Sequence, residues 1–444
     1  MNGQHSQDQQ PIGPTSRHTR RALLAGGLGL AAPLALAACG GTQASTQGKA
    51  AGEVSGKITI ALVGDVQQHP PAILDGFKAK FPKLTVETIQ GAWNPTLDKV
   101  AEMMAAGTPP DVWYGEDGRA TGWGPRGWIR DLAPYIKKDL KEADYFGMNA
   151  SKDPEGHNWA VPGDLQVAAL FYNTAAFDAV NLKYPTDKWT LDDLTSAAQK
   201  LTDPSKKQFG FFAQPNYITT SWYLFPKLFG TGVLDDTLTK SQFTTAKVQQ
   251  AMQALMAFQD KGLSPPYADM PKYPFAPAAN SEGRSVMQFH IYARLGDQPM
   301  KDLATYDVEL IPTGPGGRWT TVIANAWVIG KPSTVPDAGW EWIKWHSQYD
   351  QQVTRARSGT GVPMNKKAAD EVMSNSPAPP KNRKAFLKSL DFAGPLGTNA
   401  VWQEWRTVAQ TELIKGFNGS VPLTNALAEA HRLTQAELDK FYKK

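Results

Sequence analysis

Acidic and aromatic side chains follow three predicted strands near the start of the chain's folded part. Asp65 follows the first strand, Trp93 the second, and the pair Glu116-Asp117 the third. Ligands of open α/β sheets bind outside the carboxyl ends of the strands, so we expect these residues at one edge of a sheet. Carboxylates there can accept hydrogen bonds or move protons, and an indole ring offers a flat apolar face. The chemistry they predict is ligand binding or acid–base catalysis.

Alternating strands and helices position those side chains. The first three predicted strands are residues 57–63, 84–89 and 111–114. Asn94 and Pro95 are expected to begin the helix after the second strand, as its N-cap and first residue. Further strands are predicted at residues 167–172, 285–292 and 322–329, and further helices at 245–261, 337–349, 402–416 and 423–442. The order predicts an α/β fold with a mainly parallel sheet that is covered on both faces.

A basic and then apolar leader precedes the folded part. Arg20 and Arg21 stand directly before an uncharged run over residues 22–38. This is the layout of a secretory signal, and the arginine pair suggests the twin-arginine export route. A permanent membrane span is the weaker alternative, because the run has only 17 residues and contains Pro33. A span needs roughly 20 apolar residues. Residues 1–38 are therefore predicted to be a signal peptide.

The one cysteine of the chain, Cys39, comes directly after this run. The sequence Leu36-Ala37-Ala38-Cys39 resembles a bacterial lipobox, in which the cysteine is lipidated and becomes the first residue of the mature protein. An ordinary signal with a chance cysteine after its cleavage site is the alternative. Residues 39–52 are rich in small and polar side chains and are expected to form a flexible tether. The prediction is export followed by lipid anchoring at the outer face of the cytoplasmic membrane.

Composition excludes several classes of protein. The formal net charge of +4 over 444 residues is too near neutral to indicate nucleic-acid binding. One cysteine cannot form a disulfide within the chain, so the stability must come from the core. The 14 tryptophans suit cores, interfaces and the faces of sugar rings alike.

Several catalytic and metal-binding motifs are missing from the sequence. It has no His-Glu-x-x-His pattern, no cysteine pair and no clustered histidines, so we expect no transition metal and no other cofactor. Neither a Gly-x-x-x-x-Gly-Lys-Ser/Thr loop nor a Gly-x-Ser-x-Gly elbow is present. Nucleotide hydrolysis and serine-hydrolase chemistry are therefore not predicted.

The order of several short motifs resembles a known family. These motifs are Ala106-Gly107-Thr108-Pro109-Pro110-Asp111, Trp159-Ala160-Val161-Pro162, Leu170-Phe171-Tyr172-Asn173 and Trp189-Thr190-Leu191. Behind a lipobox, this order resembles the extracellular solute-binding lipoproteins of ABC importers, in the group of the maltose- and multiple-sugar-binding proteins. The resemblance spans nearly all of residues 53–365 and is loose from residue 381 onward.

That resemblance implies a periplasmic-binding-protein-like fold of two α/β lobes, joined by a hinge, with the ligand in the cleft between them. Lobe one would comprise residues 53–165 and 320–363, and lobe two residues 166–319 and 364–444. Closure would remove the ligand from water and form a surface that a membrane permease recognises. Such a protein is not an enzyme, and the importer's ATPase would be a different chain. We also expect a monomer.

The resemblance also implies which side chains meet the ligand. A sugar site needs flat aromatic faces and a partner for each hydroxyl, because an unpaired buried hydroxyl costs about 1–3 kcal/mol. Matched segment by segment, the candidate ligand-binding residues are Asp65, Trp93, Glu116, Asp117, Asp164, Gln166, Gln214, Asn216, Tyr217, Trp222, Tyr223, His290, Tyr292, Asn325, Trp327 and Arg357. The family often has an acidic residue where Gln166 stands and a Gly-x-Trp where residues 290–292 stand, so the sugar stays open.

These candidates have structural alternatives. Trp93, Trp222 and Trp327 are as consistent with a core position as with a ligand contact, and a satisfied core histidine is the alternative for His290. Arg357 could hold a helix end or face the permease. Tryptophans with apolar or helical surroundings are predicted to be core, namely Trp128, Trp340, Trp342 and Trp345.

The predicted function is the capture of a carbohydrate, an oligosaccharide, and its delivery to an ABC permease. A binder of a polyamine or a phosphorylated polyol is the alternative within this class, although few clustered Arg or Lys residues favour a neutral sugar. A lipid-anchored glycoside hydrolase would instead pair Glu116 or Asp117 with Asp164, about 5–9.5 Å apart. A surface adhesin or sensor would only present the bound sugar.

Overall fold

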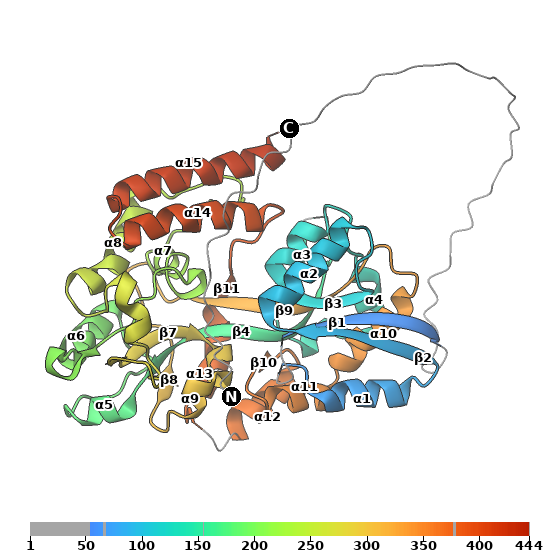
Figure 1. Cartoon of the computed structure of the whole chain (residues 1–444), viewed down its shortest axis with the longest axis horizontal. Coiled ribbons are helices and arrows are strands. Elements are labelled where there is room, and N and C mark those ends of the chain that lie inside the picture. The colour runs from blue at the N-terminus through green and yellow to red at the C-terminus, as the bar shows by residue number, and fades with distance from the viewer. Residues whose placement is uncertain (1–53, 65–67, 154, 376–378, 444) are drawn as a thin grey trace, which may run out of the picture. The chain divides into compact units, whose positions relative to one another are not determined.

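The computed structural model describes residues 54–64, 68–153, 155–375 and 379–443 (Figure 1). The predicted signal peptide, the tether and Cys39 lie outside these ranges. The described residues belong to one compact unit of the chain. In this part of the chain, none of the helices has the length and apolar character that crossing a bilayer requires.

The strands are, in chain order, β1 (Gly56–Val63), β2 (Leu84–Gly91), β3 (Val112–Glu116), β4 (Val161–Tyr172), β5 (Gln208–Phe209), β6 (Arg284–Ser285), β7 (Met287–Ile291), β8 (Asp307–Glu309), β9 (Thr320–Ile329), β10 (Val362–Pro363) and β11 (Ala393–Pro395). The first helices are α1 (Pro71–Lys80), α2 (Trp93–Ala105), α3 (Asp117–Trp123), α4 (Ala133–Asp139), α5 (Thr174–Asp178), α6 (Leu191–Leu201), α7 (Leu224–Leu228) and α8 (Ala246–Asp260). The later helices are α9 (Gln298–Lys301), α10 (Pro336–His346), α11 (Tyr349–Ala356), α12 (Lys366–Asn375), α13 (Lys384–Ser389), α14 (Trp402–Phe417) and α15 (Leu423–Tyr442). The predicted helix at 337–349 is thus two helices, α10 and the start of α11.

The large sheet has the order β10-β4-β9-β3-β1-β2. β1 pairs in parallel with both β2 and β3, as the alternation of strands and helices predicts. β9 lies antiparallel between β3 and β4. The prediction of a mainly parallel sheet is therefore wrong beyond the first three strands, because β9 returns from a distant part of the chain. The α/β class itself is confirmed.

Two helix starts show how local sequence and tertiary structure compete. α6 begins as predicted, with Thr190 as its N-cap and a capping box to Asp193. α2 begins at Trp93 with Ala92 as its N-cap, two residues before the predicted start. Pro95 fits inside this first turn because the N–H that proline lacks would have no partner within the helix there. Trp93 is consequently a helix residue and not a loop residue.

Buried apolar side chains form three clusters, which we call the first, second and third core. The first core includes residues of β1, β3 and α10, the second residues of α6, α8 and α14, and the third residues of β8, α12 and α13. β4 is buried along its whole length. It supplies Val161 to the first core, Leu170 to the second and Leu165 to the third. The exact lobe boundaries stay a prediction.

The tryptophans that were expected in the core do not all lie there. Trp340 and Trp342 are 3% and 1% exposed, which confirms their prediction, and Trp345 packs half-buried against the first core. Trp128 is 41% exposed, so its assignment to the core is wrong. Its neighbour Ile129 pairs with Gly330 and points into the core, so alternation along the extended chain turns Trp128 outward.

Candidate functional site

Four predicted site residues cannot be placed by their side chains. Asp65 lies outside the described residues, as does the predicted lipidation site Cys39. For Glu116 and Asp117 the structure describes the backbone only. Glu116 ends β3 opposite Asn325 of β9, and Asp117 begins α3. Their roles in ligand binding stay predictions.

Asp164 lies at the centre of a buried polar network and is 2% exposed. Its Oδ2 accepts a hydrogen bond from the Tyr114 hydroxyl at 2.5 Å and forms an ion pair with Arg355. Its Oδ1 accepts hydrogen bonds from the amides of Gln166 at 2.8 Å and Asn325 at 3.0 Å. The structure therefore brings together three predicted site residues, Asp164, Gln166 and Asn325.

Gln166 extends this network between distant segments. Its Nε2 also donates to the carbonyl of Thr360 at 2.7 Å, and its Oε1 accepts from the backbone N–H of Ala293 at 2.8 Å. Both polar atoms of its amide are thus used inside the protein. The network joins β4, β9 and the segment before β10, so these side chains fix the backbone where β4 passes between the cores. Whether they also contact ligand stays a prediction.

Arg355 carries the positive charge of this network, and the predicted Arg357 does not. Arg355 is 2% exposed, and its guanidinium lies 4.6 Å from the centre of the Tyr114 ring. Burial disfavours its charge, but Asp164 and Tyr114 together outweigh burial, so the pKa of Arg355 is raised above the ordinary arginine value. The Arg357 side chain is 71% exposed and lies 3.4 Å from Glu371. The sequence analysis selected Arg357, but the buried partner of Asp164 is the nearby Arg355.

Several predicted aromatic residues are core residues in the structure. Trp222 and Trp327 are fully buried, in the second and first cores. Tyr223 is 4% exposed and packs on Trp319. Tyr292 is buried in the third core, and its hydroxyl accepts a hydrogen bond from Arg383 at 3.1 Å. The structure does not bring these four side chains together.

Tyr217 and His290 form a stacked pair that is only half-buried. Their ring centres lie 5.1 Å apart, with an interplanar angle of 22°. The N–H of Ile291 donates to Nδ1 of His290 at 3.0 Å, which leaves the ring proton on Nε2. Burial and then the charge of Arg294 lower the pKa of His290 to about 3. At neutral pH the pair therefore offers flat aromatic surface and an uncharged N–H donor.

Amide side chains accompany this pair. Gln214 and Asn216 are half-buried in the same loop as Tyr217. Gln288 is 2% exposed, and its Nε2 has no hydrogen-bond partner among the described residues. It stands two positions before His290 on β7, so both side chains leave the same face of the strand. The sequence analysis did not select Gln288, although this alternation was a signal that could have found it.

On the side of the first core, Trp93 is the described aromatic candidate that keeps some exposure. It is half-buried, and its ring centre lies 6.0 Å from that of Tyr114 in an edge-on arrangement. Tyr114 in turn holds Asp164. Trp93 therefore lies beside the network that fixes the crossing strands.

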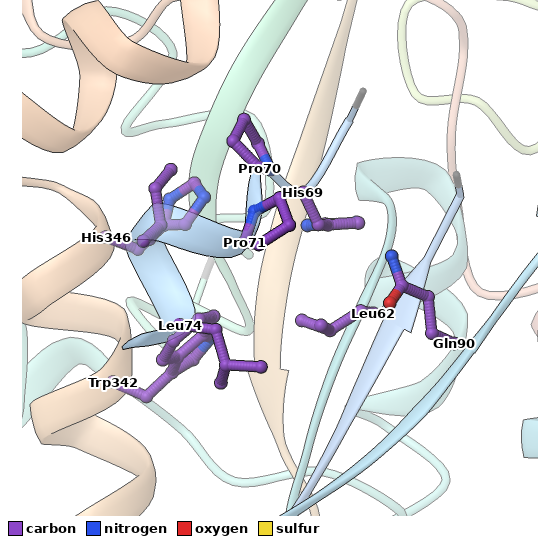
Figure 2. Close-up of a pocket in the computed structure, with 9 residues that line it drawn as sticks. Leu62, His69, Pro70, Pro71, Leu74, Gln90, Trp342 and His346 are labelled. Atoms are coloured by element: carbon purple, nitrogen blue, oxygen red, sulfur yellow. The ribbon is translucent and has the colours of Figure 1, made fainter. Parts of the chain in front are cut away.

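A separate cavity of about 70 Å³ lies in the first-core part of the molecule. Figure 2 shows Trp342 and His346 on one side of it and Leu62 and Gln90 on the other, with Pro70 and Pro71 between them. Its described lining includes none of the sixteen predicted ligand-binding residues. The predicted ligand-binding residues whose side chains the structure describes therefore lie outside this lining.

Two buried histidines line this cavity. Nε2 of His69 donates to the carbonyl of Val63 at 2.8 Å, and Nε2 of His346 has no hydrogen-bond partner in the described part of the chain. Burial and then Arg355 lower the pKa of His69 to about 3, and the same two causes hold the pKa of His346 well below 6.5. Both rings are therefore uncharged at neutral pH.

One group of side chains has the types that could hold a metal ion. The ligand atoms of Asp153, Glu155 and His157 all lie within 4.8 Å of one another. Asp153 already accepts hydrogen bonds from the rings of His157 at 2.8 Å and Trp159 at 3.0 Å. These bonds account for the position of Asp153 as a loop contact.

Comparison with known proteins identifies the family. Residues 61–353 match the family of bacterial extracellular solute-binding proteins. A Brucella abortus strain 2308 protein with the general name of binding protein is 23% identical over 299 residues, which are 66% of this chain and 72% of that protein.

Solved structures of binding proteins share the fold. An ABC substrate-binding protein of Listeria monocytogenes in complex with cycloalternan has a TM-score of 0.76 at 20% identity, over 87% of this chain and 99% of that one. A Streptomyces glaucescens receptor solved with acarbose has a TM-score of 0.71 at 17% identity, over 88% and 100%. An Agrobacterium vitis solute-binding protein with bound D-mannitol has a TM-score of 0.67 at 21% identity, over 86% and 98%. The predicted two-lobe α/β fold is confirmed. Since the family match covers more than half of its residues, this chain belongs to the bacterial extracellular solute-binding proteins.

Proposed function

We propose that this protein captures a carbohydrate, an oligosaccharide, and delivers it to an ABC permease. The observation that carries the proposal is the half-buried stack of Tyr217 on His290. Pyranose rings present apolar C–H faces that pack on such flat surfaces. The neutral ring of His290 and the amides of Gln214 and Asn216 can meet the hydroxyls. Trp93 would contribute from the side of the first core.

The ligands of similar proteins support a polyhydroxylated ligand. The Listeria protein was solved with cycloalternan, the Streptomyces receptor with acarbose and the Agrobacterium protein with D-mannitol. All three ligands carry many hydroxyls. At 17–21% identity the residues that hold them cannot be transferred to this chain. The ligand class is therefore proposed from both the family and the residues of the candidate site.

Charge pairing argues against the rival ligands and against hydrolysis. A polyamine would need unpaired carboxylates. Asp164 is the acidic candidate whose side chain the structure describes, and Arg355 already neutralises it. A phosphorylated polyol would need a cation, and Arg355 is buried against the same partner. In a glycoside hydrolase Asp164 would have to exchange protons with a substrate. Its four internal contacts favour a structural role instead.

A thermal-shift screen with mono-, di- and trisaccharides, polyols and polyamines tests the ligand class. A ligand at 100 times its dissociation constant should stabilise the protein by roughly 2.7 kcal/mol. We expect a shift with one sugar series and no release of reducing ends during incubation. Shifts only with charged compounds would overturn the sugar proposal, and reducing-end release would favour the hydrolase.

The variant Tyr217→Ala tests the site itself. It removes one face of the stacked pair, so affinity for the sugar found in the screen should fall about tenfold or more, which corresponds to 1.4 kcal/mol. Tyr184→Ala is the matched control, because Tyr184 is 40% exposed beside α5 and hydrogen-bonds Asp178. Calorimetric titration of both variants measures the effect. Equal affinities would remove Tyr217 from the site.

We infer that Cys39 anchors the mature protein by a lipid to the outer face of the cytoplasmic membrane. The lipobox-like sequence before it supports this inference. Metabolic labelling with a fatty acid should mark the wild-type chain but not Cys39→Ser, and the variant should leave the membrane fraction. Sugar uptake that depends on both this protein and a permease would support the importer. A phenotype that survives deletion of the permease would favour the adhesin or sensor.

A further inference from the structure

A contact between α3 and α14 joins the first-core and second-core parts of the molecule. Ala120 and Trp123 of α3 belong to the first core, and Trp402 and Trp405 of α14 belong to the second. α3 follows Glu116 directly and begins at Asp117, two of the predicted ligand residues. The contact between α3 and α14 therefore lies beside the end of the candidate site that Glu116 and Asp117 are predicted to form.

Arg126, in the loop after α3, makes the polar part of this contact. Its Nη1 donates to the carbonyl of Ala400 at 2.7 Å, and its Nη2 donates to the Glu404 carboxylate at 2.7 Å. The same Nη1 also donates to the carbonyl of Gly122 in α3 at 2.9 Å. The Arg126 side chain is only 27% exposed, so solvent and salt weaken these bonds less than those of a fully exposed pair. One guanidinium thus connects both sides.

The acceptor on the second-core side is itself held in place. The N–H of Ala400 donates to the Tyr442 hydroxyl of α15 at 3.2 Å. The neighbouring Asn399 donates from its Nδ2 to the carbonyl of Leu238 at 2.7 Å. α14 and α15 lie side by side (Figure 1). Arg126 therefore binds a turn that is fixed to the second-core part of the molecule.

The surfaces beside Arg126 are in close contact. A Cβ atom built on Gly118 of α3 would lie 2.7 Å from Cγ2 of Thr398 and 2.9 Å from Nε1 of Trp402. Both distances are shorter than side chains allow, so only glycine fits between the two surfaces. Loss of this contact would separate α3 from α14 and open one end of the candidate site.

We propose that Arg126 is a positioning residue that holds the two lobes together across this end of the candidate site. The proposal rests on the proposed function, because lobes that are held together would retain a bound solute. The charge-assisted hydrogen bonds from Arg126 to Ala400 and Glu404 exist only when α3 contacts α14. Arg126 consequently shifts the equilibrium between open and closed lobes without contacting the ligand.

Distance measurements between the lobes test this proposal without a ligand. Spin labels are placed at Lys137→Cys on α4 and Lys247→Cys on α8, two exposed positions beside the first and second cores, in a chain that also carries Cys39→Ser. Arg126→Ala removes both hydrogen bonds across the contact and should lower the ratio of short to long distances roughly tenfold or more. The charge exchange R126E with E404R should restore part of the short-distance population.

Arg432→Ala is the matched control, because Arg432 pairs with Glu429 within α15. We expect it to leave the distances unchanged. Equal distance distributions in wild type and Arg126→Ala would overturn the proposal, as would an equal change in the control. A lower unfolding midpoint without a change in distance would reduce Arg126 to a structural role. Since the measurement needs no sugar, a failure of the sugar screen would leave this result standing.

Discussion

At the scale of single residues, Asp164 shows how a plausible ligand residue can have a structural role. It is acidic, and the resemblance to the family places it among the candidate ligand residues. The structure places it inside the protein against Arg355. An unpaired buried charge is far more costly than the net gain from the pair. The identity of residue 164 therefore depends on a residue that is distant in the sequence.

Asp164→Asn should destabilise the fold by about 3–5 kcal/mol, because it leaves the Arg355 guanidinium buried without its counter-charge. Urea unfolding followed by circular dichroism measures the loss. Glu87→Gln is the control, because it breaks an ion pair with Lys57 whose side chains are 62% and 53% exposed. The double variant D164L with R355M should regain much of the stability. Equal losses in Asp164→Asn and Glu87→Gln would contradict this account.

The buried histidines predict a dependence of stability on pH. The pKa of His69 is lowered to about 3 and that of His346 is also lowered, whereas an unfolded histidine titrates near 6.5. Between about pH 6.5 and 3 the unfolded chain therefore binds more protons than the folded chain. Stability is full above pH 6.5 and falls below it, by up to about 1.4 kcal/mol per pH unit for each histidine.

Unfolding midpoints in urea at pH 7.5, 6.5, 5.5 and 4.5 measure this dependence. The midpoint should decline slightly from pH 7.5 to 6.5 and should fall more steeply at the lower values. Carboxylates also titrate in this range, so His69→Gln isolates the histidine contribution. It should make the fall less steep while lowering stability at pH 7.5. An unchanged slope in His69→Gln would show that His69 does not titrate as its burial requires.

At the scale of elements, local signals predict a helix or strand where the surrounding protein adds little. The capping box of α6 needs only Thr190 and Asp193, and it forms as predicted. β4 is different, since the apolar run predicts only residues 167–172 while the strand begins at Val161. Its first half contains Pro162, Gly163 and two polar residues. That half is a strand because its backbone pairs with β9 and the side chain of Asp164 finds hydrogen-bond partners. The sequence of the segment does not reveal these partners.

Thr190→Ala should cost about 1 kcal/mol of unfolding free energy, within the range of roughly 0.5–2 kcal/mol for a lost N-cap. The Thr190 hydroxyl accepts from the N–H of Asp193 at 3.2 Å, and its own N–H donates to the Asp193 carboxylate at 2.8 Å. Thr195→Ala is the control within the same helix, where Oγ1 only bonds the Leu191 carbonyl. Alanine is the better helix former there, so the control should be neutral or stabilising. Equal destabilisation would remove the special role of the cap.

At the scale of the whole molecule, the sequence predicts the family and the fold better than it predicts the site. The order of motifs resembles the family, that resemblance implies the two-lobe fold, and the fold is confirmed. The site depends on which side chains remain accessible after distant segments pack. Trp327 and Tyr217 are both aromatic residues in the predicted set, yet only Tyr217 keeps exposure. Burial of Trp327 comes from α10 and β3, and no pattern near residue 327 records these contacts.

The distribution of β4 among the three cores predicts how the molecule unfolds. One strand supplies Val161, Leu165 and Leu170 to different cores. Its buried polar network also joins β9 and Arg355. Loss of either large core would therefore expose β4 and remove support from the other. We expect one cooperative unfolding transition and not two separate lobe transitions.

Fluorine NMR of protein that contains 5-fluorotryptophan can test this prediction core by core. Trp113 and Trp342 report on the first core, and Trp222 and Trp405 on the second. All four native signals should disappear at the same urea concentration, and the calorimetric and van't Hoff enthalpies should agree. Asp164→Asn weakens the strand that joins the cores, so it should lower all four midpoints together. Midpoints that separate by core in the wild-type protein would show that the lobes unfold independently and that β4 does not couple them.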